Sequence, residues 1–182
     1  MVGRSVHLSL LALLACCAYV PRDAQAESFC ASCEVQIGVG GTYHFWGSTG
    51  GVVIPVSVSW DQNHYEFGLF RMATQQTLLD SNTRSPRLMA NPYWGVSVSR
   101  RWPLFARGPV SGFVGFGMAY RTQTDELSAT HWDFAEQLGA RVRLPGDRSV
   151  VELAIRHWSN AGFKLPNHGQ DFATVTVRFD FR

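Results

Sequence analysis

A short polar run near the C-terminal end of the chain carries residue types that can do hydrolytic chemistry. Residues 156–162 read RHWSNAG, with His157 and Ser159 two positions apart. Side chains two apart on a β-strand share a face, and their Cα atoms lie about 6.6–7 Å apart. A serine hydroxyl is a weak nucleophile until a base takes its proton. The pair predicts Ser159 as a nucleophile and His157 as its base.

A base of this kind needs an acid to orient it, and Asp171 is the candidate. Asp171 begins the next apolar alternating segment, across a hairpin from Ser159, and its parity places it on the same face. Glu152 is the nearest acidic competitor, but it has the opposite parity and lies about 16 Å further down the strand. The parity therefore predicts a catalytic triad of Ser159, His157 and Asp171.

The elements that must position these residues follow from a period of two along the chain. Apolar residues alternate with small or polar ones over about eight segments of roughly ten residues each. The apolar positions, segment by segment, are Val35, Ile37, Val39, Tyr43 and Phe45; Val52, Ile54, Val56, Val58 and Trp60; Tyr65, Phe67 and Leu69; Trp94, Val96, Val98 and Trp102; Val110, Val114, Phe116, Met118 and Tyr120; Trp132, Phe134, Leu138, Ala140, Val142 and Leu144; Val151, Leu153 and Ile155; and Val175, Val177, Phe179 and Phe181.

This pattern predicts an all-β fold, an eight-stranded antiparallel transmembrane β-barrel of the outer membrane. Such a wall is apolar on its lipid side and polar or small inside. We expect Val56, Phe116, Val142 and Phe179 to face lipid, and we expect inward-facing side chains at Arg141, Arg143 and Arg178. The alternative is a soluble, lipocalin-like barrel whose apolar face lies inside.

The connections alternate in length, as they do in outer-membrane barrels. Residues 61–63 and 144–148 read as short turns and 103–109 as a moderate one, whereas the other end carries 47–51, 77–92, 122–130 and 160–170. The tryptophans near strand ends fit aromatic girdles; they are Trp60, Trp94, Trp102 and Trp132. Two charged residues fit the pattern poorly, since Glu136 and Arg71 fall on apolar faces.

The N-terminal segment reads as a secretory signal over residues 1–26. Arg4 precedes an apolar run over 8–20, and residues 24–26 have the small-x-small pattern of a cleavage site. A lipoprotein signal at Cys16 is the alternative. The barrel domain then occupies residues 27–182.

Cys30 and Cys33 form a C-x-x-C pair, which we interpret as a small disulfide or two idle thiols. The sequence around the pair lacks a thioredoxin-like context and offers no further zinc ligands at suitable spacing.

Composition excludes one class of partner and leaves two classes of fold. The chain has 182 residues, 46% hydrophobic and 16% charged, and its net charge is +2. That charge is too small to indicate nucleic-acid binding. The low charged fraction suits both a soluble barrel and a membrane barrel, so the alternation has to decide between them. The remaining histidines read as ordinary loop or interior residues; they are His44, His64, His131 and His168.

The stretch from Ile155 to Phe181 resembles a known family. The run H-x-S-N-A over 157–161, followed by P-N-x-G over 166–169 and a terminal strand, is similar to that of the lipid A 3-O-deacylases of the PagL type. The resemblance implies a serine hydrolase without metal or cofactor. His157 and Ser159 match the family's base and nucleophile, and Asp171 stands where the family usually has glutamate. Asn160 and Gly162 match positions associated with the oxyanion hole.

Together these features predict a lipid A 3-O-deacylase in the outer membrane of a Gram-negative bacterium, with its active site facing the outer leaflet. Its partners would be lipid A or lipopolysaccharide as substrate and the surrounding outer-membrane lipids, with a homodimer left as an option. Two alternatives stay open from the residues alone: a non-enzymatic lipid-binding barrel, in which the polar residues only contact headgroups, and an outer-membrane phospholipid esterase.

Overall fold

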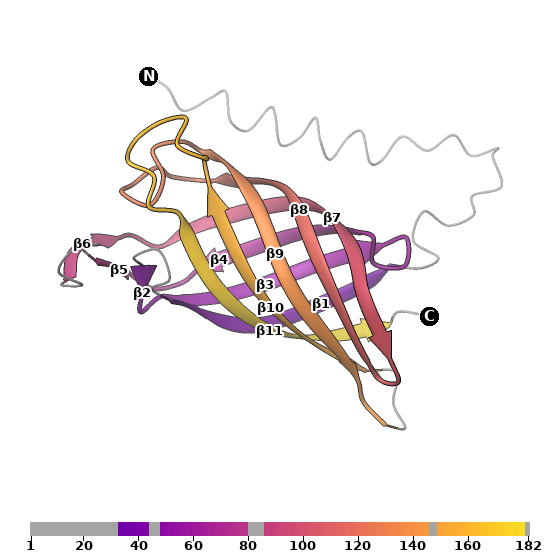
Figure 1. The fold of residues 1–182 in the computed structure, drawn as a ribbon. Coiled ribbons are helices and arrows are strands. Elements are labelled where there is room, and N and C mark those ends of the chain that lie inside the picture. Colours follow the sequence, from indigo (N-terminus) through magenta and orange to yellow (C-terminus); the bar gives the residue numbers. More distant parts are fainter. Residues whose placement is uncertain (1–32, 44–47, 80–85, 146–148, 181–182) are drawn as a thin grey trace, which may run out of the picture. The chain divides into compact units, whose positions relative to one another are not determined.

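The computed structural model describes residues 33–43, 48–79, 86–145 and 149–180. Eight antiparallel strands close into a barrel in the order β1-β11-β10-β9-β8-β7-β4-β3 (Figure 1). This confirms the predicted fold class. The barrel strands are β1 (Glu34–Thr42), β3 (Val52–Trp60), β4 (Tyr65–Met72), β7 (Tyr93–Arg107), β8 (Val110–Arg121), β9 (Trp132–Arg143), β10 (Val150–Ser159) and β11 (Gln170–Asp180). Within the described ranges, no helix is long and apolar enough to cross a membrane.

Three short strands form a second sheet that the sequence did not reveal. β2 (Ser48–Thr49), β5 (Gln76–Leu79) and β6 (Pro86–Ala90) pair in the order β2-β5-β6. The segments 47–51 and 77–92 were expected to be connections only, which is wrong for part of their length. Strands of two to five residues are too short to display a readable period of two, which explains the omission.

The long connections gather at one end of the barrel and the short turns at the other (Figure 1). One expected connection, 103–109, is wrong, because β7 continues to Arg107 and only Gly108 and Pro109 form the turn. A bulge between Pro103 and Phe105 allows the strand to continue. Phe105 then lies directly over Gly112 of β8, where an added Cβ would meet its ring at 2.3 Å.

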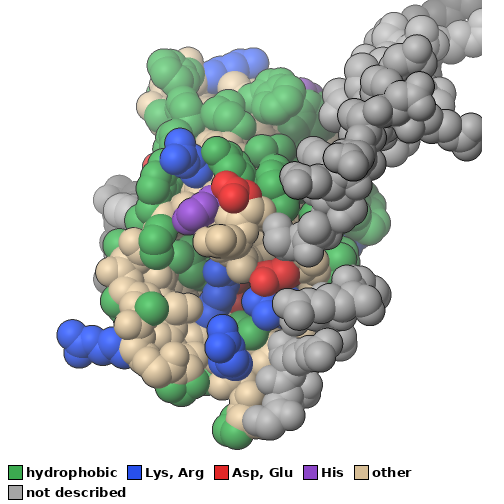
Figure 2. Space-filling view, turned by 90° about the vertical axis from the view of Figure 1, so that its right-hand side faces the viewer, with side chains coloured by type: hydrophobic (Ala, Val, Ile, Leu, Met, Phe, Trp, Pro, Cys, Tyr) green, Lys and Arg blue, Asp and Glu red, His purple; other side chains and the backbone are tan. Residues whose placement is uncertain are grey.

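The two faces of the wall divide as the alternation predicts. Val56 and Phe116 are exposed on the outside and Val142 is half-buried, whereas the side chain of Phe179 lies outside the described residues. Arg141 and Arg178 point inward, with side chains 15% and 16% exposed. Arg143 has inward parity but is exposed, because it ends β9 at the mouth of the barrel. Viewed from the end with the short turns, hydrophobic side chains gather along the upper rim and charged ones nearer the middle (Figure 2).

The barrel interior is filled in two layers. At the end with the long connections, apolar side chains form a plug around Phe70, Trp158 and Phe172, which meet edge to face at centroid distances of 5.1–5.6 Å. Beneath the plug lies a cluster of buried charges. An eight-stranded barrel is narrow enough for side chains to fill it completely.

The buried charges are paired with one another. Glu66 accepts from both Arg101 and Arg156, the latter at 2.8 Å, and Glu152 accepts from Arg101 at 3.1 Å and from Arg141 at 2.8 Å. All five side chains lie inside the wall. Pairing of this kind allows charges to remain ionised away from water.

The N-terminal features fall mostly outside the described residues. The predicted signal segment, residues 1–26, and Cys30 lie there. Cys33, the first described residue, is disulfide-bonded.

Candidate active site

Alternation along β10 places His157 and Ser159 on the outer wall and Trp158 between them on the inside. Trp158 is 1% exposed and is clamped edge to face by Phe70 and Phe172. Gly95 makes room for it, since a Cβ there would meet the indole at 2.5 Å. The inward ring therefore anchors the strand segment that carries the two outward groups.

Asp171 lies beside His157 on the outer wall. The two residues are register partners in the β10–β11 pair, and Asp171 Oδ1 lies 2.8 Å from His157 Nδ1. Asp171 is 1% exposed and His157 is 25% exposed, so the carboxylate is sealed behind the ring. An acid on Nδ1 leaves Nε2 to face a nucleophile, which is the arrangement of a serine hydrolase base. Glu152, excluded by parity, indeed lies inside with Arg101 and Arg141.

Ser159 is the last residue of β10, so it lies at the end of the barrel that carries the long connections. With His157 it lines a hollow of about 310 Å³, completed by Asn167, His168 and Gly169. Between the described side chains of Ser159 and His157 there is no hydrogen bond. Hydrogen bonds of this kind often tighten only when substrate is bound.

Gly169 closes the hollow against the histidine ring. Its φ is +73°, a left-handed conformation that glycine adopts without strain. A Cβ at this position would meet His157 Cε1 at 2.5 Å. Both the backbone conformation and the close approach therefore require glycine, which accounts for the G of the P-N-x-G run.

The loop 160–169 is held by the buried side chain of Asn160. Its Nδ2 donates to the carbonyl oxygen of Lys164 at 2.8 Å and to Ser128 Oγ at 3.3 Å, and its Oδ1 accepts from the N–H of Gly162 at 2.9 Å. Asn167 Oδ1 accepts from the Asn160 N–H at 3.1 Å. The N–H groups of both predicted oxyanion residues, Asn160 and Gly162, are thus engaged by acceptors within the loop.

The β8–β9 connection supports this loop from the side. The Gly169 N–H donates to the Leu127 carbonyl at 2.9 Å, and the Ala129 N–H donates to the Pro166 carbonyl at 2.9 Å. Ser128, which receives the Asn160 amide, itself donates to Asp133 at 2.7 Å. None of these supports was predicted from the sequence, because the contacts between the two connections join residues more than thirty positions apart.

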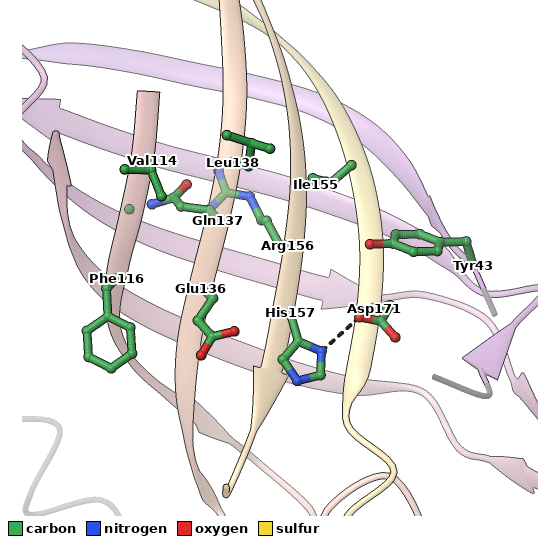
Figure 3. Close-up of a pocket in the computed structure, with 11 residues that line it drawn as sticks. Tyr43, Val114, Phe116, Glu136, Gln137, Leu138, Ile155, Arg156, His157 and Asp171 are labelled. Carbon is green, nitrogen blue, oxygen red and sulfur yellow. Dashed lines mark hydrogen bonds and ion pairs between the residues drawn. The ribbon is translucent and has the colours of Figure 1, made fainter. Parts of the chain in front are cut away.

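A groove of about 620 Å³ runs along the outer wall from the histidine toward the middle of the barrel (Figure 3). Apolar side chains of β8, β9 and β10 form most of it; they are Val114, Phe116, Leu138 and Ile155. Its polar members near the site are Asp171, Tyr43 and Glu136. Burial raises the pKa of the Tyr43 phenol and Asp171 raises it further, so this hydroxyl stays protonated.

Fold and site together define a class: an outer-membrane β-barrel with an acid, an imidazole and a hydroxyl gathered on its outward wall. The model of the family "Lipid A 3-O-deacylase (PagL)" matches residues 49–180. The chain therefore belongs to the lipid A 3-O-deacylase (PagL) family, and it is a hydrolase by that membership. This confirms the family indicated by residues 155–181 and extends the match over most of the barrel.

Solved structures agree on the fold. The outer membrane enzyme PagL is similar with a TM-score of 0.52 and 18% identity, over 81% of this chain and 99% of the other. Neisserial surface protein A gives a TM-score of 0.54 at 11% identity, over 82% of this chain and 97% of the other. A comparison with curated proteins finds no match.

Proposed function

We propose that the protein removes the ester-linked hydroxyacyl chain at the 3-position of lipid A, with Ser159 as nucleophile, His157 as general base and Asp171 as the orienting acid. The observation that carries this proposal is the 2.8 Å Asp171–His157 pair on the outer wall, next to Ser159. Catalytic groups that face lipid rather than the barrel interior suit a substrate that is itself a membrane lipid.

The chemistry follows from the roles of the three groups. As Ser159 Oγ attacks the ester carbonyl carbon, its proton passes to His157 Nε2 and the carbonyl oxygen becomes an oxyanion. The C–O bond to the sugar then breaks, and the imidazolium returns the proton to the sugar oxygen. A water molecule, activated by the same ring, hydrolyses the acyl-enzyme. The products are a free hydroxy fatty acid and an under-acylated lipid A.

We propose Asn160 and Gly162 as the oxyanion donors, in line with their place in the family motif. Their N–H groups now donate to Asn167 and to the Asn160 side chain. Binding an oxyanion would require them to exchange these acceptors for the substrate oxygen. One such donor contributes about 3–4 kcal/mol to transition-state stabilisation.

The proposal includes an orientation in the membrane. Ser159 lies at the end of the barrel that carries the long connections, which in outer-membrane barrels is the outer side. The site would then lie at the level of the outer leaflet, where lipid A is found. The groove below His157 would receive an acyl chain.

The experiment is mass spectrometry of lipid A incubated with the purified barrel in detergent micelles. We expect loss of one hydroxyacyl chain with the wild-type protein and none with Ser159→Ala. Unchanged lipid A together with hydrolysed phospholipid would favour a phospholipid esterase. Unchanged lipids of both kinds, with a correctly folded barrel, would favour a non-enzymatic lipid-binding barrel.

A further inference from the structure

Glu136 is a carboxylate on the outward wall, where the sequence pattern calls for an apolar residue. It is exposed, and its register partners are Phe116 on β8 and His157 on β10. The His157 ring therefore lies between two strands that each present an acid at the same level: Asp171 on β11 and Glu136 on β9. Figure 3 shows the Glu136 side chain directed toward the side of the ring that faces away from Asp171.

An ionised side chain on a lipid-facing wall is costly and marks function unless it serves as a headgroup contact. The groove beside Glu136 is lined by apolar side chains of β8, β9 and β10 as well as by His157 and Asp171, so the carboxylate stands at an otherwise largely apolar stretch of the wall. His157 is the neighbouring group that becomes a cation during acyl transfer. The other titratable or charged groups around His157 are Asp171 on β11, Tyr43 after β1, His168 in the loop, Asp133 on β9 and Arg156 on β10.

We propose that Glu136 is a second positioning carboxylate, which together with Asp171 flanks His157 and stabilises the imidazolium formed when Ser159 loses its proton. The proposal rests on the proposed function. Asp171 holds Nδ1 and sets the orientation of the ring, whereas Glu136 makes no hydrogen bond to the ring and acts through its charge. Because lipid screens charge far less than water does, this effect on the outer wall should exceed that of an exposed ion pair.

Removal of the Glu136 charge should make the imidazolium less stable and the transfer of the Ser159 proton to His157 harder. For Glu136→Gln we expect the acid limb of the kcat/KM profile to move down by about one pH unit, the scale of a single nearby charge. The plateau above that limb should fall about tenfold, through kcat and with little change in KM. Glu136→Asp should recover part of the loss, because it restores the charge.

The test is the pH–rate profile of lipid A deacylation by the purified barrel. The matched control is Glu126→Gln, the same substitution at an exposed position in the β8–β9 connection, which should match wild type. Heat-modifiability on gels reports folding for every variant. We also expect the Asp171→Ala, Glu136→Gln double variant to be at least tenfold less active than Asp171→Ala alone.

Three outcomes would overturn the proposal. A raised KM with unchanged kcat and an unmoved acid limb would make Glu136 a headgroup contact. Loss of the folded band, with normal kinetics in the molecules that remain folded, would make it structural. Wild-type kinetics would leave it without a role. If the wild-type protein or the Ser159→Ala control fails in the lipid A assay, the proposed function is at fault instead.

Discussion

Two clusters of charge lie on either side of the same strand, separated by the thickness of the wall. Arg156 points inward, where it joins Glu66, and His157, the next residue, points outward to Asp171. The inner cluster is almost fully buried and its charges are paired with one another. The outer cluster lies on the outside of the wall and contains the His157 imidazole, which the proposed mechanism uses as its base.

Under the proposed function, this difference separates charges that stabilise the barrel from charges that can meet a membrane substrate. Inside the narrow barrel, a charge has no route to a membrane substrate, and its partners only make its burial tolerable. On the outer wall, an ionised side chain is costly in lipid, so we expect it to be retained only where it has a function. Strand parity therefore decides on which side of the wall each residue of β10 lies.

The largest expected effect is on the outer wall. Ser159→Ala and His157→Asn should each lower deacylation by about 10⁴-fold or more, because nucleophile and base act as a unit. The double variant should be little worse than either single one. Both side chains lie on the wall and outside the interior plug, so the heat-modifiable folded band should persist. Deacylation by Ser159→Ala at the wild-type rate would contradict the mechanism.

The second effect is on the inner cluster. Arg101→Met leaves Glu66 and Glu152 with one cation fewer, and breaking a buried pair in this way costs about 3–5 kcal/mol. We expect the urea midpoint of unfolding in micelles to fall, while turnover per folded molecule stays within a few-fold of wild type. The matched control is Arg71→Gln, which removes a cation from the outer wall and should leave the midpoint nearly unchanged. If Arg101→Met and Arg71→Gln lowered the midpoint equally, the difference between inner and outer charges would be contradicted.

The third effect is on the orienting acid. Asp171→Ala should lower turnover about 10²- to 10⁴-fold and spare folding, since an acid often contributes less than the Ser–His pair. Asp171→Glu should keep most activity, because it retains a carboxylate beside His157 Nδ1. The lipid A assay with both variants checks this. An Ala variant with full activity would remove Asp171 from the triad.

Much of the fold and part of the site were predictable because both depend on strand parity. The alternation predicted the barrel and which residues face outward. It also predicted that Asp171 lies near His157 and that Glu152 lies inside, as the structure has them. What parity cannot give is the pairing register between strands. The position of Glu136 opposite His157 depends on that register, so the sequence could only mark Glu136 as a misfit.

Other features of the structure could not be predicted from the sequence for a related reason. The Trp158 plug and the Ser128–Asn160 contact join segments distant in sequence, and no local pattern encodes such contacts. The extension of β7 past Pro103 was hidden by a proline that read as a turn signal. The structure accommodates that proline at a bulge, which the local sequence does not announce.

The smallest effect separates the two roles open to Asn160. If its side chain only holds the loop, Asn160→Ala removes the contacts to Lys164, Ser128 and Gly162, and deacylation should fall about tenfold as the loop loosens. Asn160→Asp keeps the acceptor for the Gly162 N–H and should lose less. If the Asn160 amide also donates to the oxyanion, both variants should lose about 10²- to 10³-fold, because neither keeps the amide donor. Comparison of the two variants in one lipid A assay, with the urea midpoint as a check that the barrel itself stays equally stable, therefore distinguishes a residue that shapes the site from one that takes part in the reaction.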